Sequence, residues 1–207
     1  MPNPTKGDLL IIFLDFDGVV NHTSMSMRDE GMMKSGVYYA DPRCVEHLKD
    51  LIIKLDATIV VSSTWRILTD KEFFRTFFGD WFYDRMHDDW RTKRLGTIRG
   101  LEVRDWLERN IGQGYWRFKN YLILDDDQDF LWYQPLVHVN QKTGLDEKHV
   151  KKAMMIASGV KKIEIPEVLP RDLMEILSDE LVDCKDKRRG VKATVAALHQ
   201  KLVDFYH

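Results

Sequence analysis

The 207-residue sequence is 44% hydrophobic and 31% charged, and its formal net charge is −2. A chain of this size and composition can bury one full hydrophobic core, which excludes a disordered or fibrous protein. The charge excludes a polybasic surface over the whole molecule, and the two cysteines, Cys44 and Cys184, are too few and too far apart for a disulfide framework or a zinc site.

The stretch Leu9–Asn21, with the sequence LLIIFLDFDGVVN, contains the first predicted strand. Its apolar run 9–14 is typical of a strand buried on both faces, normally in the middle of a parallel sheet. Asp15 and Asp17 follow at the C-terminal end of this strand, and Gly18 permits a tight turn. Ligands of open α/β sheets bind at this end of the strands, so we expect the two aspartates at the centre of the chemistry.

The polar, methionine-rich segment 22–40 has little periodicity, and we expect it to form a small flap over the two carboxylates. Its methionines either line the substrate or pack the flap onto the body of the protein. Asp41 and Pro42 then supply an N-cap and a first helical residue, and apolar residues recur at helical spacing through Leu55. Thr58–Val61 is a second β-branched strand, so the order strand, helix, strand predicts parallel pairing.

The second predicted strand ends in the sequence SSTWR. Ser62 and Ser63 fall at the same end of the sheet as Asp15, where a hydroxyl can donate to an anionic ligand, and Arg66 follows closely. Serines after a strand are also common as turn or cap residues. The motif taken alone therefore leaves both interpretations open.

Aromatic and basic residues crowd the middle of the chain. The phenylalanines in segment 73–78 fall on one face of a predicted helix, which indicates that most of them belong to the core. The run 81–94, which includes Lys93, has no clean period; it suits either contact with phosphates and stacked bases or a solvated loop. A further helix is predicted over Thr97–Asn110. Arg99 in its first turn is unfavourable for the helix dipole, which favours an anion-binding role.

Tyr121–Leu124 is the third predicted buried strand, and it runs directly into Asp125, Asp126 and Asp127. Three successive carboxylates repel one another unless a cation or a basic group neutralises them. The pattern therefore indicates a metal site, with a solvated acidic turn as the alternative.

Leu136–Val139 is a predicted fourth strand, and a helix from Asp146 to Gly159 completes an alternating α/β pattern. We expect a catalytic domain over residues 1–159 and a helical extension over residues 160–207 packed on it. No apolar run approaches the roughly 20 residues of a membrane span, and the N-terminus lacks the features of a secretory signal. We therefore expect a cytoplasmic location and no membrane partner. The sequence predicts no particular oligomeric state.

In a parallel sheet, the three polar strand ends converge on one crevice. They would bring together carboxylates, serine hydroxyls and a basic group, a combination that suits phosphoryl transfer. Mg²⁺ is the matching cation, because it prefers oxygen ligands and is typically held by one or two carboxylates together with substrate phosphate. The spacings of a calcium-binding EF-hand, a Walker A loop and a dinucleotide fingerprint are absent.

The ordered motifs FLDFDGVV, IVVSSTWR and YLILDDDQDF resemble the motif set of the haloacid dehalogenase (HAD) superfamily over residues 9–157. SSTWR, IRGLEVRDWL and GLDEKHVKKA are similar, more narrowly, to HAD-type phosphatase domains of RNA-repair and phage proteins. The resemblance implies an α/β fold with a three-layer, Rossmann-like parallel sheet. It also implies a Mg²⁺-dependent phosphomonoesterase that works through an aspartyl-phosphate.

The resemblance assigns roles to individual residues. Asp15 would be the nucleophile, and Asp17 would protonate the leaving oxygen and then deprotonate the attacking water. Mg²⁺ would be held by Asp15, the backbone carbonyl of Asp17 and Asp126, with Asp125 orienting the basic residue or the waters on the metal. Ser62 would hydrogen-bond the transferring phosphoryl group.

The basic residue of the third motif is Arg99, Lys93 or Lys119. We favour Arg99, because it precedes the helix that leads into the acidic strand end. Ser63, Arg66 and Lys93 complete the expected substrate-binding set.

The aromatic and basic stretch favours a nucleic-acid end, such as a 3′-phosphate of RNA or DNA, as the phosphorylated substrate. A free nucleotide is the close alternative. A catalytically silent HAD-like binding module is the alternative from a different functional class, because function depends on the site and not on the fold.

Overall fold

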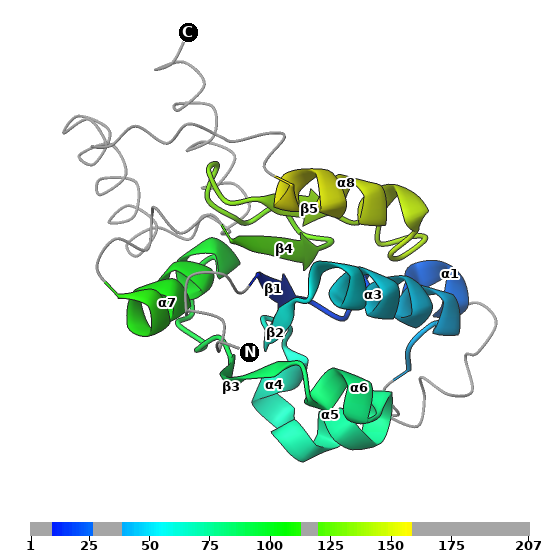
Figure 1. Cartoon of the computed structure of the whole chain (residues 1–207), viewed down its shortest axis with the longest axis horizontal. Coiled ribbons are helices and arrows are strands. Elements are labelled where there is room, and N and C mark those ends of the chain that lie inside the picture. The colour runs from blue at the N-terminus through cyan, green and yellow to red at the C-terminus, as the bar shows by residue number, and fades with distance from the viewer. Residues whose placement is uncertain (1–9, 27–38, 113–119, 159–207) are drawn as a thin grey trace, which may run out of the picture.

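The computed structural model describes residues 10–26, 39–112 and 120–158 (Figure 1). Its centre is a five-stranded sheet in the order β3-β2-β1-β4-β5, and every neighbouring pair is parallel. This arrangement confirms the predicted α/β class and the central place of the first strand. The strands are β1 (Ile11–Leu14), β2 (Thr58–Val61), β3 (Met86–Arg91), β4 (Tyr121–Asp125) and β5 (Leu136–His138).

Helices cover both faces of the sheet, which gives the three layers that the sequence predicted. Side chains alternate along β1, so Ile12 and Leu14 face one core and Ile11 and Phe13 face the other. The first core includes residues of α3 (Pro42–Leu55) and α8 (Glu147–Ala157), which pack against each other, and the second includes α7 (Arg99–Ile111) (Figure 1). Because β1 is buried on both faces, its C-terminal end is held rigidly between the two helical layers.

Two of the helices begin where the sequence predicted. Asp41 caps α3 by accepting a hydrogen bond from the backbone N–H of Arg43, and Pro42 is the first helical residue. Asp146 caps α8 by accepting from the backbone N–H groups of Lys148 and His149. These local caps fix the helix starts without help from distant parts of the chain.

For the aperiodic run 81–94 the sequence left open a solvated loop or a contact with nucleic acid. The run contains β3, so the prediction of a loop is wrong there, and the contact with nucleic acid stays a prediction. Only Met86 of this strand is fully buried, since β3 lies at the edge of the sheet. Its pairing with β2 also shifts in register between Ile59 and Val61. An irregular edge strand with charged residues lacks the apolar alternation by which strands are recognised.

The aromatic residues of the middle segment build a core against β1, as the helical spacing predicted. Phe74 and Phe78 on α5 (Lys71–Phe78) and Phe82 on α6 (Asp80–Tyr83) are buried. The rings of Phe78 and Phe82 stack with their centroids 4.6 Å apart. Of these residues, only Phe82 belongs to the run 81–94, and its buried ring cannot stack on a nucleotide base. Two short helices, α1 (Thr23–Ser26) and α4 (Trp65–Leu68), complete the described elements.

Several expectations lie outside the described residues. They are the helical extension 160–207, most of the flap, Lys119 and Cys184. Within the described ranges, no helix is both long enough and apolar enough to cross a lipid bilayer.

Candidate active site

Three adjacent strands deliver polar residues to one edge of the sheet. Leu14 at the end of β1 is in register with Val61 of β2 and Leu124 of β4. The next residue of each strand is therefore polar and at the same level: Asp15, Ser62 and Asp125. The backbone N–H of Asp15 donates to the Leu124 carbonyl and that of Ser62 to the Leu14 carbonyl, both at 2.9 Å.

The carboxylate of Asp15 is buried and lacks the hydrogen bonds that a buried carboxylate needs. Only 1% of the residue is exposed, and both carboxylate oxygens and the Ser62 Oγ have no hydrogen-bond partner among the described residues. Burial raises the pKa of Asp15 to about 6, although the neighbouring Arg99 and, to a smaller extent, the nearby Ser63 hydroxyl lower it. Buried acceptors without partners cost free energy, so these atoms indicate a place where a ligand supplies the missing contacts.

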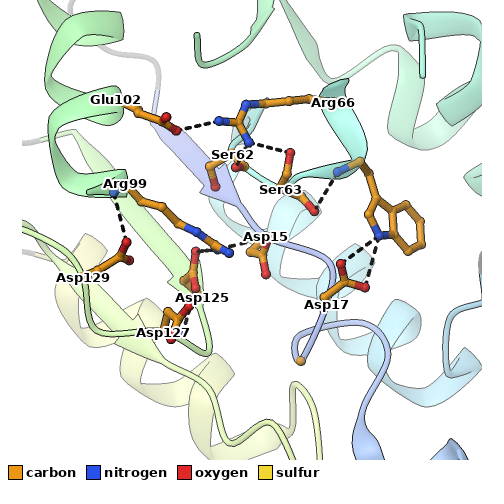
Figure 2. A network of polar contacts seen from close by, with 12 residues as sticks. Asp15, Asp17, Ser62, Ser63, Arg66, Arg99, Glu102, Asp125, Asp127 and Asp129 are labelled. Carbon is orange, nitrogen blue, oxygen red and sulfur yellow. Dashed lines mark hydrogen bonds and ion pairs between the residues drawn. The ribbon is translucent and has the colours of Figure 1, made fainter. Parts of the chain in front are cut away.

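Arg99, the first residue of α7, brings the positive charge to the strand ends (Figure 2). Its Nη1 donates to Asp125 Oδ2 at 2.5 Å and lies 3.2 Å from Asp15 Oδ1. The two carboxylates hold the pKa of Arg99 above its usual range, although burial opposes the charge. Of the two described candidates for the basic residue, Arg99 thus lies at the site, while Lys93 is exposed in the segment after β3.

Three carboxylates at this edge could hold a cation. Oxygen atoms of Asp15, Asp125 and Asp126 all lie within 4.8 Å of one another. Burial raises the pKa of Asp125 well above its usual value, and Asp15 raises it further; burial and the nearby Asp127 raise the pKa of Asp126. One arginine faces this group, so a hard divalent cation with oxygen ligands fits the residues present.

Gly18 allows Asp126 to reach this position. The glycine has a φ of +77°, and a Cβ built on it would lie 2.3 Å from the Asp126 Cγ. Any other residue would therefore be strained in its backbone and would displace the carboxylate. The sequence indicated the tight turn, but it did not indicate that the turn makes space for an acid from β4.

Asp17 is exposed, and its carboxylate contacts Trp65 and Asn21. Its Oδ1 and Oδ2 each lie 3.1 Å from the indole Nε1 of Trp65, and Asn21 Nδ2 donates to Oδ1 at 2.8 Å. The cluster that could hold a metal does not include the Asp17 side chain. The expected role of its backbone carbonyl as a metal ligand stays a prediction.

Arg66 was expected to bind substrate, and the structure places its guanidinium elsewhere. The side chain is buried, with Nε donating to the Thr92 carbonyl at 2.9 Å and Nη1 donating to the carbonyls of Ser62 and Ser63. Nη2 donates to Glu102 Oε2 at 2.5 Å. These contacts engage each nitrogen of the guanidinium and connect the end of β2 to Thr92, just after β3, and to α7. A substrate-binding role of Arg66 stays a prediction.

Ser62 and Ser63 are both buried but differ in what their hydroxyls contact. Ser63 Oγ accepts a hydrogen bond from the backbone N–H of Trp65 at 3.3 Å, while Ser62 Oγ has no partner among the described residues. Ser62 thus offers a hydroxyl at the strand ends, and Ser63 shapes the turn into α4.

Sequence reasoning did not single out Trp65, Asn21 or Glu102. Trp65 and Glu102 lie inside the motifs SSTWR and IRGLEVRDWL, next to residues that were singled out. No sequence pattern marked Glu102, in the first turns of α7, as a buried acid, because its partner Arg66 lies on another element.

A parallel sheet with its acids at the C-terminal ends of adjacent central strands defines a Rossmann-like α/β protein with its site in the crevice at those ends. A comparison with protein families specifies the group further. The family model described as "HAD domain in Swiss Army Knife RNA repair proteins" matches residues 11–150, and the chain belongs to this family. Searches of curated proteins and of solved structures returned no match.

Proposed function

We propose that the protein is a Mg²⁺-dependent phosphomonoesterase that acts through an aspartyl-phosphate on phosphorylated ends of nucleic acid. The observation that carries this proposal is the pair of buried groups without hydrogen-bond partners, the Asp15 carboxylate and the Ser62 hydroxyl, beside Arg99. A phosphoryl group between them would accept from the hydroxyl and the guanidinium and receive attack from the carboxylate. Membership of a family named for RNA repair supports the substrate class.

In the first step, an oxygen of Asp15 attacks phosphorus and the bond from phosphorus to the ester oxygen breaks. Asp17, as the general acid, gives a proton to that leaving oxygen, so the product departs as an alcohol. Arg99 and Ser62 donate hydrogen bonds to the phosphoryl oxygens as their charge redistributes.

In the second step, the Asp17 carboxylate takes a proton from water while the water oxygen attacks the phosphorus of the aspartyl-phosphate. The bond between phosphorus and the Asp15 oxygen breaks, which releases inorganic phosphate and regenerates both aspartates. The covalent route divides one difficult displacement into two easier ones.

Asp15, Asp126 and the backbone carbonyl of Asp17 would hold Mg²⁺, which neutralises the charge of the three-carboxylate group and of the phosphoryl oxygens. Asp125 keeps Arg99 in place, because its Oδ2 accepts from the guanidinium while its Oδ1 accepts from the backbone N–H of Asp127. The arginine is thus oriented before any substrate arrives.

The enzymatic proposal is tested with p-nitrophenyl phosphate. We expect the wild-type protein to release phosphate with Mg²⁺ and to lose this activity with EDTA. Asp15→Asn should lower kcat by at least about 10⁴-fold, because it removes the nucleophile and keeps the shape of the side chain. Equal rates for the wild type and the variant would reject the enzyme and leave a silent binding module.

The substrate class is tested with oligonucleotides that carry a 3′-phosphate or a 5′-phosphate and with mononucleotides, each at two salt concentrations. An enzyme for nucleic-acid ends should prefer an oligonucleotide and lose affinity at higher salt, because contacts with backbone phosphates release counterions. Best turnover of mononucleotides with little salt dependence would instead indicate a nucleotidase.

A further inference from the structure

We propose that Trp65 is a positioning residue that holds the Asp17 carboxylate in the orientation for proton transfer, and that the aromatic cluster around its indole fixes it there. This inference rests on the proposed function, because Asp17 has a proton-transfer role only in a phosphatase. It gives the aromatic residues packed around Trp65 a role in catalysis in addition to their role in the hydrophobic core.

Asp17 needs external support because of where it lies. It occupies the turn directly after β1 and is exposed, and an exposed aspartate ordinarily samples several rotamers. Here the indole N–H of Trp65 lies 3.1 Å from each carboxylate oxygen, so a single donor is shared between both. Figure 2 shows the two contacts as dashed lines that end at the labelled Asp17. A donor shared in this way restrains the plane of the carboxylate as well as its position.

A second donor completes the restraint. Asn21 Nδ2 donates to Asp17 Oδ1 at 2.8 Å, and Asn21 Oδ1 accepts from the backbone N–H of Gly18 at 2.9 Å. The turn thereby holds its own carboxylate from one side, while Trp65 holds it from another element. The indole is the donor that ties Asp17 to the end of β2, where Ser62 lies.

The indole is itself fixed by aromatic rings. Trp65 is 5% exposed, and its ring lies 4.9 Å from that of Phe16 and 5.6 Å, at a right angle, from that of Phe77 (centroid distances). Its backbone N–H also donates to Ser63 Oγ. Edge-to-face and tilted ring contacts in a packed core leave a side chain little rotational freedom. The Nε1 atom therefore has a fixed position, and its hydrogen bonds hold the Asp17 carboxylate relative to it.

The first test uses Trp65→Phe with two substrates that differ in their leaving group. Nitrophenolate leaves without much protonation, whereas the alkoxide of glycerol phosphate needs a proton from Asp17. Since general acid catalysis contributes about 10²- to 10⁴-fold, we expect kcat/KM for glycerol phosphate to fall about 10²-fold. The value for p-nitrophenyl phosphate should fall only a few-fold, and kcat/KM is the proper measure because it excludes the later hydrolysis of the aspartyl-phosphate.

Trp106→Phe is the matched control. The Trp106 indole is also buried and donates from Nε1, to the Asp89 carbonyl at 2.8 Å, but it packs against Phe13 in the core on the α7 side of the sheet. This variant should change both substrates by the same factor. If Trp65→Phe also changes both by the same factor, Trp65 has only a structural role and the inference is overturned.

The second test needs neither activity nor any change at Trp65. The chain has six tryptophans, whose indole N–H resonances can be resolved and assigned by NMR. Asp17→Ala should shift the Trp65 indole resonance upfield and leave that of Trp106 in place, because only Trp65 loses its acceptor. A Trp65 resonance that does not move would overturn the inference.

The two proposals fail in different ways. If wild type and Asp15→Asn release phosphate equally, the proposed function is wrong, whatever the indole resonance shows. If Asp15→Asn is inactive but Trp65→Phe shows no dependence on the leaving group, only the role of Trp65 is wrong.

Discussion

Two arginines, the buried Arg66 and the partly exposed Arg99, lie close to the same strand ends and differ in what surrounds them (Figure 2). Arg66 is enclosed by backbone carbonyls and Glu102, and each of its nitrogens has a protein partner. Arg99 instead contacts Asp125 and Asp15, and Asp15 still lacks hydrogen bonds to both of its oxygens.

The difference shows which buried charges belong to the framework and which to the site. A fully satisfied ion pair lowers the energy of one arrangement and leaves nothing for a ligand to supply. A group that is buried but unsatisfied costs stability until something binds it. Substitutions in the satisfied ion pair are therefore expected to change mainly the free energy of unfolding. Substitutions at the unsatisfied group are expected to change mainly the activity.

The largest expected effect on stability is that of Arg66→Met. It leaves Glu102 buried without its cation, which should cost about 4 kcal/mol in the free energy of unfolding measured with urea. Adding Glu102→Gln should recover part of this loss, because the double variant no longer buries an unpaired charge. A single variant destabilised by less than about 1 kcal/mol would show that Arg66 is not a framework residue.

Arg99→Met should instead lower activity more than stability. Loss of the guanidinium at the strand ends should lower kcat about 10²- to 10³-fold, equivalent to about 3–4 kcal/mol. The stability cost should be smaller than for Arg66→Met, because the Arg99 side chain is 21% exposed and water can reach part of its place. If the two variants affected activity and stability in the same proportion, the distinction between the arginines would be lost.

Asp15→Asn should stabilise the metal-free protein, with an effect that depends on pH. The folded-state pKa of Asp15 is raised to about 6 from 3.8, so its contribution to stability is complete below pH 4 and is lost as pH rises through 6. The variant does not titrate there and should exceed the wild type by about 3 kcal/mol at pH 8. Unfolding in EDTA across this pH range measures the gap, which should close in acid; a gap independent of pH would contradict the prediction.

The smallest expected effects separate the two serines. Ser62→Ala removes a buried hydroxyl without a partner, so stability should stay the same or rise by up to about 1 kcal/mol while kcat/KM falls. Ser63→Ala removes the acceptor for the Trp65 N–H and should lower stability by about 1 kcal/mol with a smaller loss of activity. The reverse pattern would exchange the roles of the two hydroxyls.

Much of the fold could be predicted because its signals are local. The strands β1, β2 and β4 are apolar runs, and Asp41 and Asp146 are caps whose partners lie within three residues. The edge strand β3 could not be predicted, because its pairing depends on β2 and its side chains are mostly not buried.

For the site, the sequence indicated which residues lie at the strand ends but not what their side chains contact. Acids and serines at strand ends were located correctly, because parallel strands bring these ends together. The sequence did not indicate that the Arg66 side chain is buried, since its carboxylate partner Glu102 lies on another element, α7. The different surroundings of Ser62 and Ser63 likewise depend on side-chain directions that a sequence does not give. Their roles in catalysis remain predictions.

The strand order β3-β2-β1-β4-β5 also has a consequence for synthesis of the chain. β1 emerges first but ends in the centre of the sheet, so one of its edges stays unpaired until β4 has been made. Arg99 precedes Asp125 in the sequence, so the cation is available to Asp15 before the second buried carboxylate arrives. In the finished sheet, the buried carboxylates of Asp15 and Asp125 share this one cation.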